Sequence, residues 1–432
     1  MRVLLINTYD LGHQPFGLAS PAAWLLRDGH QVTCADLAVE SMPPQTGAFD
    51  CIAFHLPMHT ATRMAAPLLG RLHRQHPAVR LACYGLYAPL NAEYLRGLGA
   101  EAIIGGEFEA GLCAWVNGDA VQGTSYERLN FIAPQRDLLP VLGNYSKLRV
   151  NGEARTVGYT EASRGCKHLC RHCPVVPVYE GRFRIVAADV VLEDIRRQVA
   201  AGAQHITFGD PDFWNGPTHA QRIVHALHKE FPLLTYDVTI KVEHLLRHRD
   251  LLADLRSTGC LMVTAAVESL DDAVLARLDK GHTRAGFELA VALVRDAGLT
   301  LAPTFIAFTP WTSRASYLEL LRTLAALDLV ENVPPVQLAL RLLIPAGSRM
   351  LELEEMRELV TGFDQEALLH RWQHPDGSMD TLAAAAIRIA GAGGSRREIF
   401  EKLWVLAANG EYETPPMQAR AAVPFLDEPW YC

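Results

Sequence analysis

Residues 164–174 read RGCKHLCRHCP, and this stretch places three cysteines within eight residues. Three residues separate Cys166 from Cys170, and two separate Cys170 from Cys173. Thiolates are soft ligands that suit iron–sulfur clusters, and closely spaced cysteines on one loop can hold one cluster. Three protein ligands leave one iron of a four-iron cluster open, so that a small molecule can coordinate there. The spacing therefore predicts an iron–sulfur site with an open position.

A structural zinc site is the alternative for these cysteines, and it usually takes four protein ligands. His168 or His172 could supply the fourth ligand. Local zinc sites, however, more often consist of two separate pairs of ligands, each pair close in sequence, and the sequence has no second pair here. The remaining internal cysteines lie in apolar, strand-like or helix-like contexts, which predicts buried small side chains. These are Cys34, Cys51, Cys83, Cys113 and Cys260.

Length and composition predict a globular protein of two or three domains. The chain has 432 residues, of which 49% are hydrophobic and 20% charged, and this excludes general disorder. Its net charge of -8 argues against a broad nucleic-acid or membrane surface. No apolar run reaches the roughly 18–20 residues of a membrane span, and the first residues lack a signal-peptide layout. Nine cysteines, an odd number, without secretory features predict a reducing cytoplasm.

Alternating strand-like and helix-like segments predict an α/β fold with two parallel layers. The first domain, residues 1–117, is expected to be a doubly wound Rossmann-like sheet with its ligand at the carboxyl ends of the strands. Its expected strands are residues 3–7, 31–34, 51–54, 80–83 and 102–104, and its expected helices are residues 18–27, 61–74 and 90–98. Residues 118–155 are expected to be a connector.

Six further strand-like runs predict a partial (β/α)6 barrel over residues 156–350. These runs are residues 157–162, 205–208, 235–240, 261–266, 301–308 and 336–343. Residues 351–432 are expected to form a mainly helical C-terminal segment. The three cysteines thus follow the first barrel strand, at the end of the barrel where binding loops gather.

This position resembles the signature loop of the radical S-adenosylmethionine (SAM) superfamily. The resemblance implies a [4Fe-4S] cluster on Cys166, Cys170 and Cys173, with the amino and carboxylate groups of SAM on the open iron. One electron from the reduced cluster then breaks a carbon–sulfur bond of SAM and releases a carbon radical. An electron donor such as flavodoxin or ferredoxin is expected as a partner.

Further motifs extend the resemblance over about residues 156–350. They are Phe208-Gly209-Asp210-Pro211, Val267-Glu268-Ser269-Leu270, Lys280-Gly281-His282-Thr283, Phe305-Ile306-Ala307-Phe308-Thr309-Pro310 and Ile344-Pro345-Ala346-Gly347. The usual glycine before the proline of the Phe305 motif is absent. The resemblance implies SAM contacts from His172, Phe208, Gly209, Asp210, Glu268 and Arg341.

The first domain resembles the cobalamin-binding-type domain that precedes the barrel in one class of this superfamily. The Gly17-Leu18-Ala19 helix start and the Gly105-Gly106 pair after the fifth strand carry this resemblance. Domains with a histidine lower ligand carry Asp-x-His-x-x-Gly, whereas residues 10–17 read DLGHQPFG and place His13 at a different spacing. Cobalamin is expected as a possible cofactor, with His13, Gly105 and Gly106 as its contacts.

The end of the chain adds a candidate catalytic thiol, Cys432. Together with Trp372-Gln373-His374-Pro375-Asp376, it resembles small radical SAM proteins with cysteine-rich or selenocysteine-containing tails. A relative of those proteins, which acts in arsinothricin synthesis, builds an arsenic–carbon bond from the 3-amino-3-carboxypropyl group of SAM. A selenocysteine codon directly after Cys432 would extend this likeness.

The leading functional prediction is cobalamin-dependent radical methylation of a small-molecule substrate. Transfer of a 3-amino-3-carboxypropyl group to an acceptor such as arsenic is the alternative within the same family. An iron–sulfur electron carrier or metal sensor is the alternative from another class, and it is disfavoured because carriers normally use four protein ligands. Neither nucleic acid nor a membrane is expected as a partner.

Overall fold

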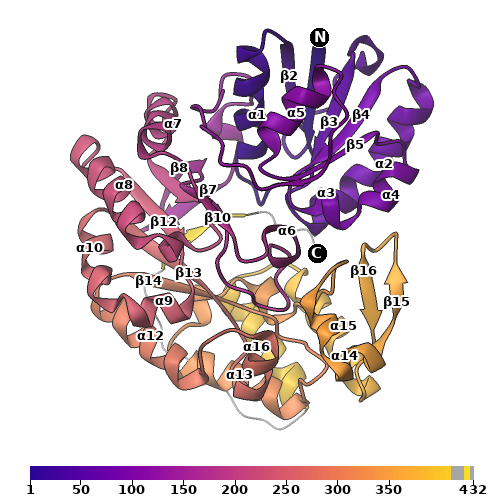
Figure 1. Ribbon diagram of the computed structural model, residues 1–432. Coiled ribbons are helices and arrows are strands. Elements are labelled where there is room, and N and C mark those ends of the chain that lie inside the picture. Colours follow the sequence, from indigo (N-terminus) through magenta and orange to yellow (C-terminus); the bar gives the residue numbers. More distant parts are fainter. Residues whose placement is uncertain (410–422, 429–432) are drawn as a thin grey trace.

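The protein is described by a computed structural model that covers residues 1–409 and 423–428 (Figure 1). Two parallel sheets dominate it, one near the N-terminus and one curled sheet in the middle of the chain. The predicted α/β class is confirmed. Cys432, the candidate catalytic thiol, lies outside the described residues.

The first sheet contains six parallel strands in the order β2-β1-β3-β4-β5-β6. Helices α1 (Phe16–Arg27) and α5 (Phe108–Val116) pack on one face, and α2 (His59–Gln75), α3 (Tyr87–Leu90) and α4 (Ala92–Gly97) pack on the other. The strands are β1 (Arg2–Asn7), β2 (Gln31–Asp36), β3 (Cys51–His55), β4 (Arg80–Tyr84), β5 (Ala102–Gly106) and β6 (Gln122–Ser125). The five predicted strands are confirmed, while β6 lies in the segment expected to be a connector.

The second sheet has the order β14-β13-β12-β11-β8-β7-β17, and its first five strands are parallel. Antiparallel β7 and β17 extend it beyond β8. Helices α7 (Ala188–Ala200), α8 (Pro217–Glu230), α10 (Leu252–Ser257) and α12 (Arg284–Asp296) cover its outer side (Figure 1). The strands are β7 (Lys147–Val150), β8 (Glu153–Thr160), β11 (His205–Phe208), β12 (Thr235–Thr239), β13 (Cys260–Glu268), β14 (Thr300–Phe305) and β17 (Phe425–Leu426).

The sixth predicted barrel strand, residues 336–343, does not form. Pro335–Leu338 is a 3₁₀ helix instead, and only a single parallel bridge joins Phe308 to Arg341. Pro334 and Pro335 have no backbone N–H to donate to a sheet. The Gln337 side chain takes the place of a strand, since its Oε1 accepts the Phe305 N–H over 3.2 Å. The barrel is therefore a half-barrel of five parallel strands, open on the β14 side.

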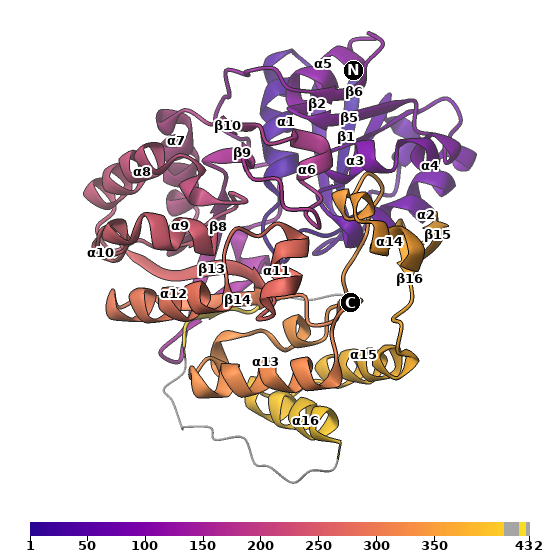
Figure 2. The same ribbon diagram turned by 60° about the horizontal axis from the view of Figure 1, so that its bottom comes forward.

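The C-terminal segment is mainly helical, as predicted, but also contains a hairpin that the sequence analysis missed. Helices α15 (Gly377–Ala390) and α16 (Arg396–Ala408) pack beside α13 (Arg314–Ala326) and complete the barrel core (Figure 2). The hairpin pairs β15 (Val360–Asp364) with β16 (Leu369–Trp372). Within the described residues, we find no helix with the length and apolar character of a membrane span.

Candidate functional site

The loop that carries the clustered cysteines begins after a short strand, β9 (Ser163–Gly165), which pairs with β10 (Phe183–Ile185). Gly165 ends β9 with a φ of +71°. A Cβ at this position would lie 2.4 Å from the Tyr179 ring and 2.5 Å from the Arg182 carbonyl oxygen. Only glycine fits both this conformation and this space. The local sequence thus sets the direction in which the chain enters the cysteine loop.

Cys166, Cys170 and Cys173 are free thiols, and Cys170 is buried. The Cys173 N–H donates to the Cys170 carbonyl oxygen over 3.2 Å, so the loop turns between them. Burial, together with the neighbouring Cys170 and Cys166, raises the pKa of the Cys173 thiol to about 12. Such thiols ionise only when a cation compensates them. The three cysteines of this loop fit the donor set of an iron–sulfur cluster.

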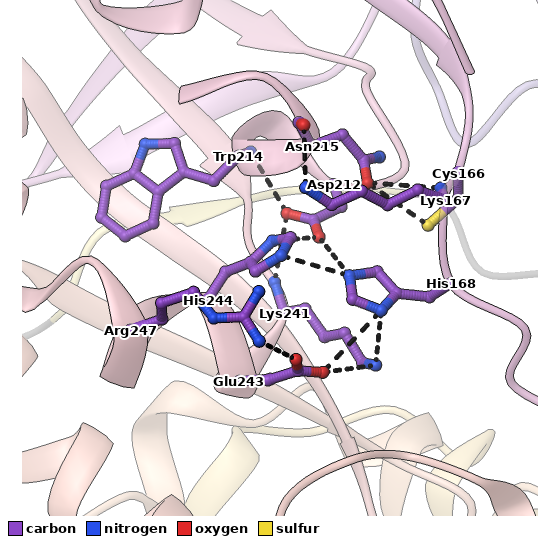
Figure 3. Close-up of polar contacts among 10 residues, drawn as sticks. All are labelled: Cys166, Lys167, His168, Asp212, Trp214, Asn215, Lys241, Glu243, His244 and Arg247. Atoms are coloured by element: carbon purple, nitrogen blue, oxygen red, sulfur yellow. Dashed lines mark hydrogen bonds and ion pairs between the residues drawn. The ribbon is translucent and has the colours of Figure 1, made fainter. Parts of the chain in front are cut away.

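Asn215 fastens the start of the cysteine loop to the barrel (Figure 3). Its Oδ1 lies 3.8 Å from Cys166 Sγ and accepts the Lys167 N–H over 3.4 Å. In return, Lys167 Nζ donates to the Asn215 carbonyl oxygen over 3.0 Å. Asn215 belongs to the 3₁₀ helix Phe213–Asn215, which follows β11. A side chain after the second barrel strand therefore orients the first cysteine.

His168, inside the loop, has ligand atoms within 4.8 Å of those of Asp212 and His244 (Figure 3). Lys241 Nζ lies 3.1 Å from His168 Nδ1. Since an ammonium only donates, Nδ1 accepts, and the neutral ring carries its proton on Nε2. His168 Nε2 lies 3.3 Å from His244 Nε2, and His244 Nδ1 lies 2.7 Å from Asp212 Oδ2. His168 therefore accepts from Lys241 through Nδ1 and carries its proton on Nε2, which leaves it no free lone pair for a metal ion.

His172, Glu268 and Lys280 form a second polar group beside the loop. Glu268 Oε1 lies 3.2 Å from His172 Nε2 and 3.3 Å from Lys280 Nζ. Burial alone would raise the pKa of the Glu268 carboxyl, but Lys280 and His172 outweigh it and lower the pKa to about 2. Burial opposes the charge of Lys280, yet Glu268, Cys170 and Cys173 raise its pKa. A buried cation thus lies near two of the cysteines that would carry a cluster.

The other residues expected to contact SAM lie in different surroundings. Phe208 and Gly209 line the main cavity of the protein. The buried carboxylate of Asp210 accepts hydrogen bonds from the Ala162 N–H and the Ser163 hydroxyl, so it supports the start of β9. Arg341 pairs with Asp380 over 2.7 Å and lies over the Trp372 ring. These contacts are to neighbouring side chains, and Arg341 does not line the main cavity.

The main cavity has a volume of about 480 Å³ and is lined from both sheets. Loops at the carboxyl ends of β1, β3, β4 and β5 line one side, and barrel strands β11 to β14 line the other. Gly165 and Val175, which flank the cysteine loop, belong to its wall. A ligand in this cavity would therefore touch the first sheet, the barrel and the base of the cysteine loop together.

Two of the three residues expected to contact cobalamin line this cavity, namely His13 and Gly106. The His13 ring stacks on Tyr159 with 4.6 Å between ring centroids, and burial lowers its pKa to about 4. Gly106 has a φ of +66°, and a Cβ there would lie 2.1 Å from the Ser125 carbonyl oxygen. Gly105 does not line the cavity and packs against Pro89 instead, since a Cβ at residue 105 would lie 2.6 Å from Pro89 Cγ.

His55, at the end of β3, is a cavity residue that the sequence analysis missed. Burial lowers its pKa to about 3, so the ring is neutral. A Cβ at Gly17 would lie 2.1 Å from His55 Nε2, so the start of α1 has room for this ring only because residue 17 is glycine. A histidine at the end of an apolar strand, before Leu56-Pro57, is the signal that was available.

Arg164 is the second residue that the sequence analysis did not single out. Its guanidinium lies 2.6 Å from Glu109, 2.7 Å from Glu161 and 3.6 Å from Glu107. Glu107 and Glu109 come from the start of α5 in the first sheet, whereas Arg164 lies in β9. Burial raises the pKa of the Glu107 carboxyl to about 7, although Arg164 opposes this shift. This ion cluster joins the two halves of the molecule two residues before Cys166.

Residues 160–322 match the family model of the radical SAM superfamily. Over 334 residues the chain is 25% identical to the hopanoid C-3 methylase of Methylococcus capsulatus, which covers 71% of this chain and 64% of that relative. Over 189 residues it is 28% identical to a tRNA-2-methylthio-N(6)-dimethylallyladenosine synthase of Desulfosudis oleivorans, covering 41% and 38% of the two chains. The chain thus spans less than two thirds of the length of these curated relatives.

Two solved structures share the fold at low identity. OxsB, a cobalamin-dependent SAM radical enzyme with aqua-cobalamin bound, matches with a TM-score of 0.69 and 17% identity, over 89% of this chain and 66% of that chain. The radical SAM methyltransferase TsrM of Kitasatospora setae, with tryptophan and a SAM analogue bound, matches with a TM-score of 0.66 and 15% identity. That match covers 90% of this chain and 89% of the other. Both likenesses extend over both sheets.

Proposed function

Because this chain carries a radical SAM domain, we propose that it is a cobalamin-dependent radical SAM methyltransferase that acts on a small molecule. The observation that carries this proposal is the single cavity that joins the carboxyl ends of both sheets at the base of the cysteine loop. Methyl transfer requires the methyl carrier, the radical source and the substrate to meet in one enclosed space. A cavity that belonged to only one sheet would not bring these groups together.

We assign generation of the radical to the cysteine loop. Cys166, Cys170 and Cys173 would hold a [4Fe-4S] cluster, and the open position would take SAM. When bound, these groups supply one electron that breaks a carbon–sulfur bond of SAM. Lys280 would hold positive charge against the anionic cluster, and Glu268 would hold Lys280 in place. The reducing electron would come from a donor such as flavodoxin or ferredoxin.

Cobalamin is assigned to the side of the cavity formed by the first sheet. Three glycines line this side, Gly17 at the start of α1, Gly85 after β4 and Gly106 at the end of β5. Glycine lets a backbone approach a large flat ligand closely. His55 lies among them as a neutral, buried ring. These residues fit a bulky ligand at the carboxyl edge of the sheet, which is the usual ligand edge of such sheets.

The proposal is tested by anaerobic reconstitution with iron, sulfide, SAM and a strong reductant, with and without hydroxocobalamin. We expect 5′-deoxyadenosine together with S-adenosylhomocysteine, the second only when cobalamin is present. Methylthioadenosine would contradict methylation and would instead indicate transfer of the aminocarboxypropyl group. A preparation that binds a cluster but never cleaves SAM would contradict the enzymatic proposal altogether.

Replacing any one of Cys166, Cys170 and Cys173 with Ala is expected to abolish cluster absorbance near ~400 nm and all reductive SAM cleavage. Each cysteine supplies one of only three thiolates, so a single loss leaves the cluster underligated. Cys260→Ala provides the control, since this buried thiol lies in β13 and does not line the cavity. Iron and sulfide content per chain measures the result. Normal iron content in the Cys170→Ala protein would contradict the assignment.

The Gly17→Ala substitution is expected to weaken hydroxocobalamin binding by about tenfold or more, because the new Cβ displaces the His55 ring into the cavity. Cluster absorbance should be unchanged, since the cysteine loop lies in the other half of the chain. Gly97→Ala is the matched control, because a Cβ there meets no atom within 4 Å. Spectroscopic titration with hydroxocobalamin measures the effect, and equal affinity of the two variants would contradict the placement of cobalamin.

A further inference from the structure

The inside of the half-barrel is lined by polar side chains that the proposed roles of the cluster, SAM and cobalamin leave unused. Along each strand, alternate residues face the cavity, as the two-residue period of a strand requires. They are Thr207 on β11, Asp237 and Thr239 on β12, Met262 and Thr264 on β13, and Ala302 and Thr304 on β14. Closed barrels of this kind usually fill their interior with bulky branched side chains. Here threonine hydroxyls and one carboxylate face open space.

Asp237 is the charged group of this interior, and it is 4% exposed. Its Oδ1 accepts from the Thr207 hydroxyl over 2.6 Å and lies 2.8 Å from His205 Nε2. Among the described residues, no donor lies within hydrogen-bond distance of Oδ2. A buried carboxylate oxygen at a cavity surface is costly unless a donor meets it. This atom is therefore a position where a ligand would find an unpaired acceptor.

The end of the chain brings a second carboxylate to the same cavity. Strand β17 pairs with β7, and the Asp427 carboxylate is anchored by Arg149 over 2.6 Å and by the Lys147 N–H. This anchor directs the next residue, Glu428, into the cavity wall. Glu428 and Asp237 line the same cavity, and burial and then the charge of Asp237 raise the pKa of the Glu428 carboxyl to about 8.

Two basic side chains, His13 and Arg396, lie near Glu428. His13 Nε2 lies 4.0 Å away, and its ring is neutral because burial lowers its pKa to about 4. The His13 side chain is 7% exposed and lines the cavity, and no described residue hydrogen-bonds to its ring. Arg396 donates to the Glu331 carbonyl oxygen over 2.6 Å and lies over the Phe425 ring. The cavity thus holds two acidic groups and one neutral ring, and the guanidinium of Arg396, which lines the same cavity and lowers the pKa of Glu428, is hydrogen-bonded to the Glu331 carbonyl oxygen.

We propose that the half-barrel binds a small polar substrate through a basic nitrogen of that substrate, which contacts Asp237 and Glu428. The threonine hydroxyls of β12 to β14 would meet its hydroxyl or amide groups. A charge-assisted hydrogen bond in a buried site is strong because water does not compete for it. The inference rests on the proposed function for the reaction, and it adds the chemical class of the substrate. It predicts that a cationic probe is preferred over neutral and anionic probes of the same shape.

The test uses three probes that differ only in one group: cyclohexylamine, cyclohexanol and cyclohexanecarboxylate. Binding to the full chain with reconstituted cluster is measured by calorimetry and by saturation-transfer NMR. We expect the amine to bind, and the other two to bind at least about tenfold more weakly, because only the ammonium pairs with both carboxylates. Asp237→Asn and Glu428→Gln should each weaken binding of the amine by about tenfold. Asp364→Asn, at an exposed ion pair with Arg371 in β15, should leave amine binding unchanged.

Several results would overturn the proposal: equal binding of the alcohol, preference for the carboxylate, competition of SAM with the amine, or no binding of any probe. If Asp237→Asn fails to fold, Glu428→Gln still decides, because residue 428 lies beyond the last strand and outside the barrel core. SAM cleavage measured without any probe keeps the two proposals separate. Cleavage without amine binding removes only the substrate inference, whereas amine binding without cleavage removes only the proposed reaction.

Discussion

The Arg164→Met protein is expected to lose about 3–5 kcal/mol of its free energy of unfolding, or to fail to accumulate. Arg164 is the cation of a buried cluster in which Glu107 and Glu109 have no exposed surface. Without this guanidinium, these carboxylates and Glu161 lose the cation that contacts all three of them, while the charges of Arg136 and Arg184 still act on Glu161 and Glu107. An uncompensated buried charge costs far more than a lost surface ion pair. Chemical denaturation followed by fluorescence measures the loss.

The same replacement is expected to lower cluster loading, since Arg164 lies two residues before Cys166 and ties the start of the loop to α5. Arg182→Met is the matched control, because Arg182 also pairs with a glutamate, Glu180, and lies over an aromatic ring, but at the surface. Its removal should change the free energy of unfolding far less than that of Arg164, because water screens an exposed ion pair. Arg164→Lys keeps the charge but not the planar guanidinium, so its loss in the free energy of unfolding should lie between those of Arg164→Met and Arg182→Met. A loss at Arg164 no larger than that at Arg182 would contradict the role of this cluster.

The strands of both sheets could largely be predicted because their residues carry a local signal. Residues 205–208 were predicted as a strand and form β11 with those bounds, since a short apolar run lies between helix-like segments. Strands without such a run were missed. Residues 157–162, predicted as a strand, overlap β8, but β7 and its hairpin with β8 were missed, although Asn151-Gly152 between them has positive φ angles of 50° and 79°, as a two-residue hairpin turn requires. That dipeptide was the available signal.

In the candidate site, too, only the residues with a local sequence signal could be predicted. The three cysteines of one loop are neighbours in sequence, so their spacing alone predicted their chemistry. Residues brought together only by tertiary packing gave no such signal: Arg164 meets Glu109 of the other half of the molecule across 55 residues, and within the first half His55 meets Gly17 across 38. Neither pair has a periodicity or a motif, because each partner obeys the pattern of its own element. The structure supplies both pairs: the first joins the two halves of the molecule, and the second shapes the first-sheet side of the cavity.

A second large effect is expected at Lys280, which is 3% exposed and lies 3.3 Å from Glu268 Oε1. Lys280→Met should cost about 3–5 kcal/mol of the free energy of unfolding, because it leaves the Glu268 carboxylate buried with only His172 beside it. The double variant Lys280→Met/Glu268→Gln should recover most of this loss, since it removes both charges. Denaturation of the four proteins of this cycle gives the coupling between the two residues. A double variant as unstable as Lys280→Met would contradict charge compensation.

The pH dependence of the same proteins identifies the responsible group. In the wild type, Lys280 and His172 hold the pKa of Glu268 at about 2, below its ordinary value of 4.5. The ion pair therefore stabilises the protein above about pH 4.5, and its contribution is lost as the pH falls towards about 2. In Lys280→Met, burial outweighs the remaining His172, so the folded-state pKa of Glu268 should lie above 4.5. The ionised carboxylate then destabilises the folded protein, and acidification from about pH 7 should restore stability by protonating it. The gap between the wild type and Lys280→Met should thus narrow as the pH falls, while Lys280→Met/Glu268→Gln should show no such recovery. A gap of constant size across this range would mean that Glu268 is not the carboxylate that Lys280 compensates.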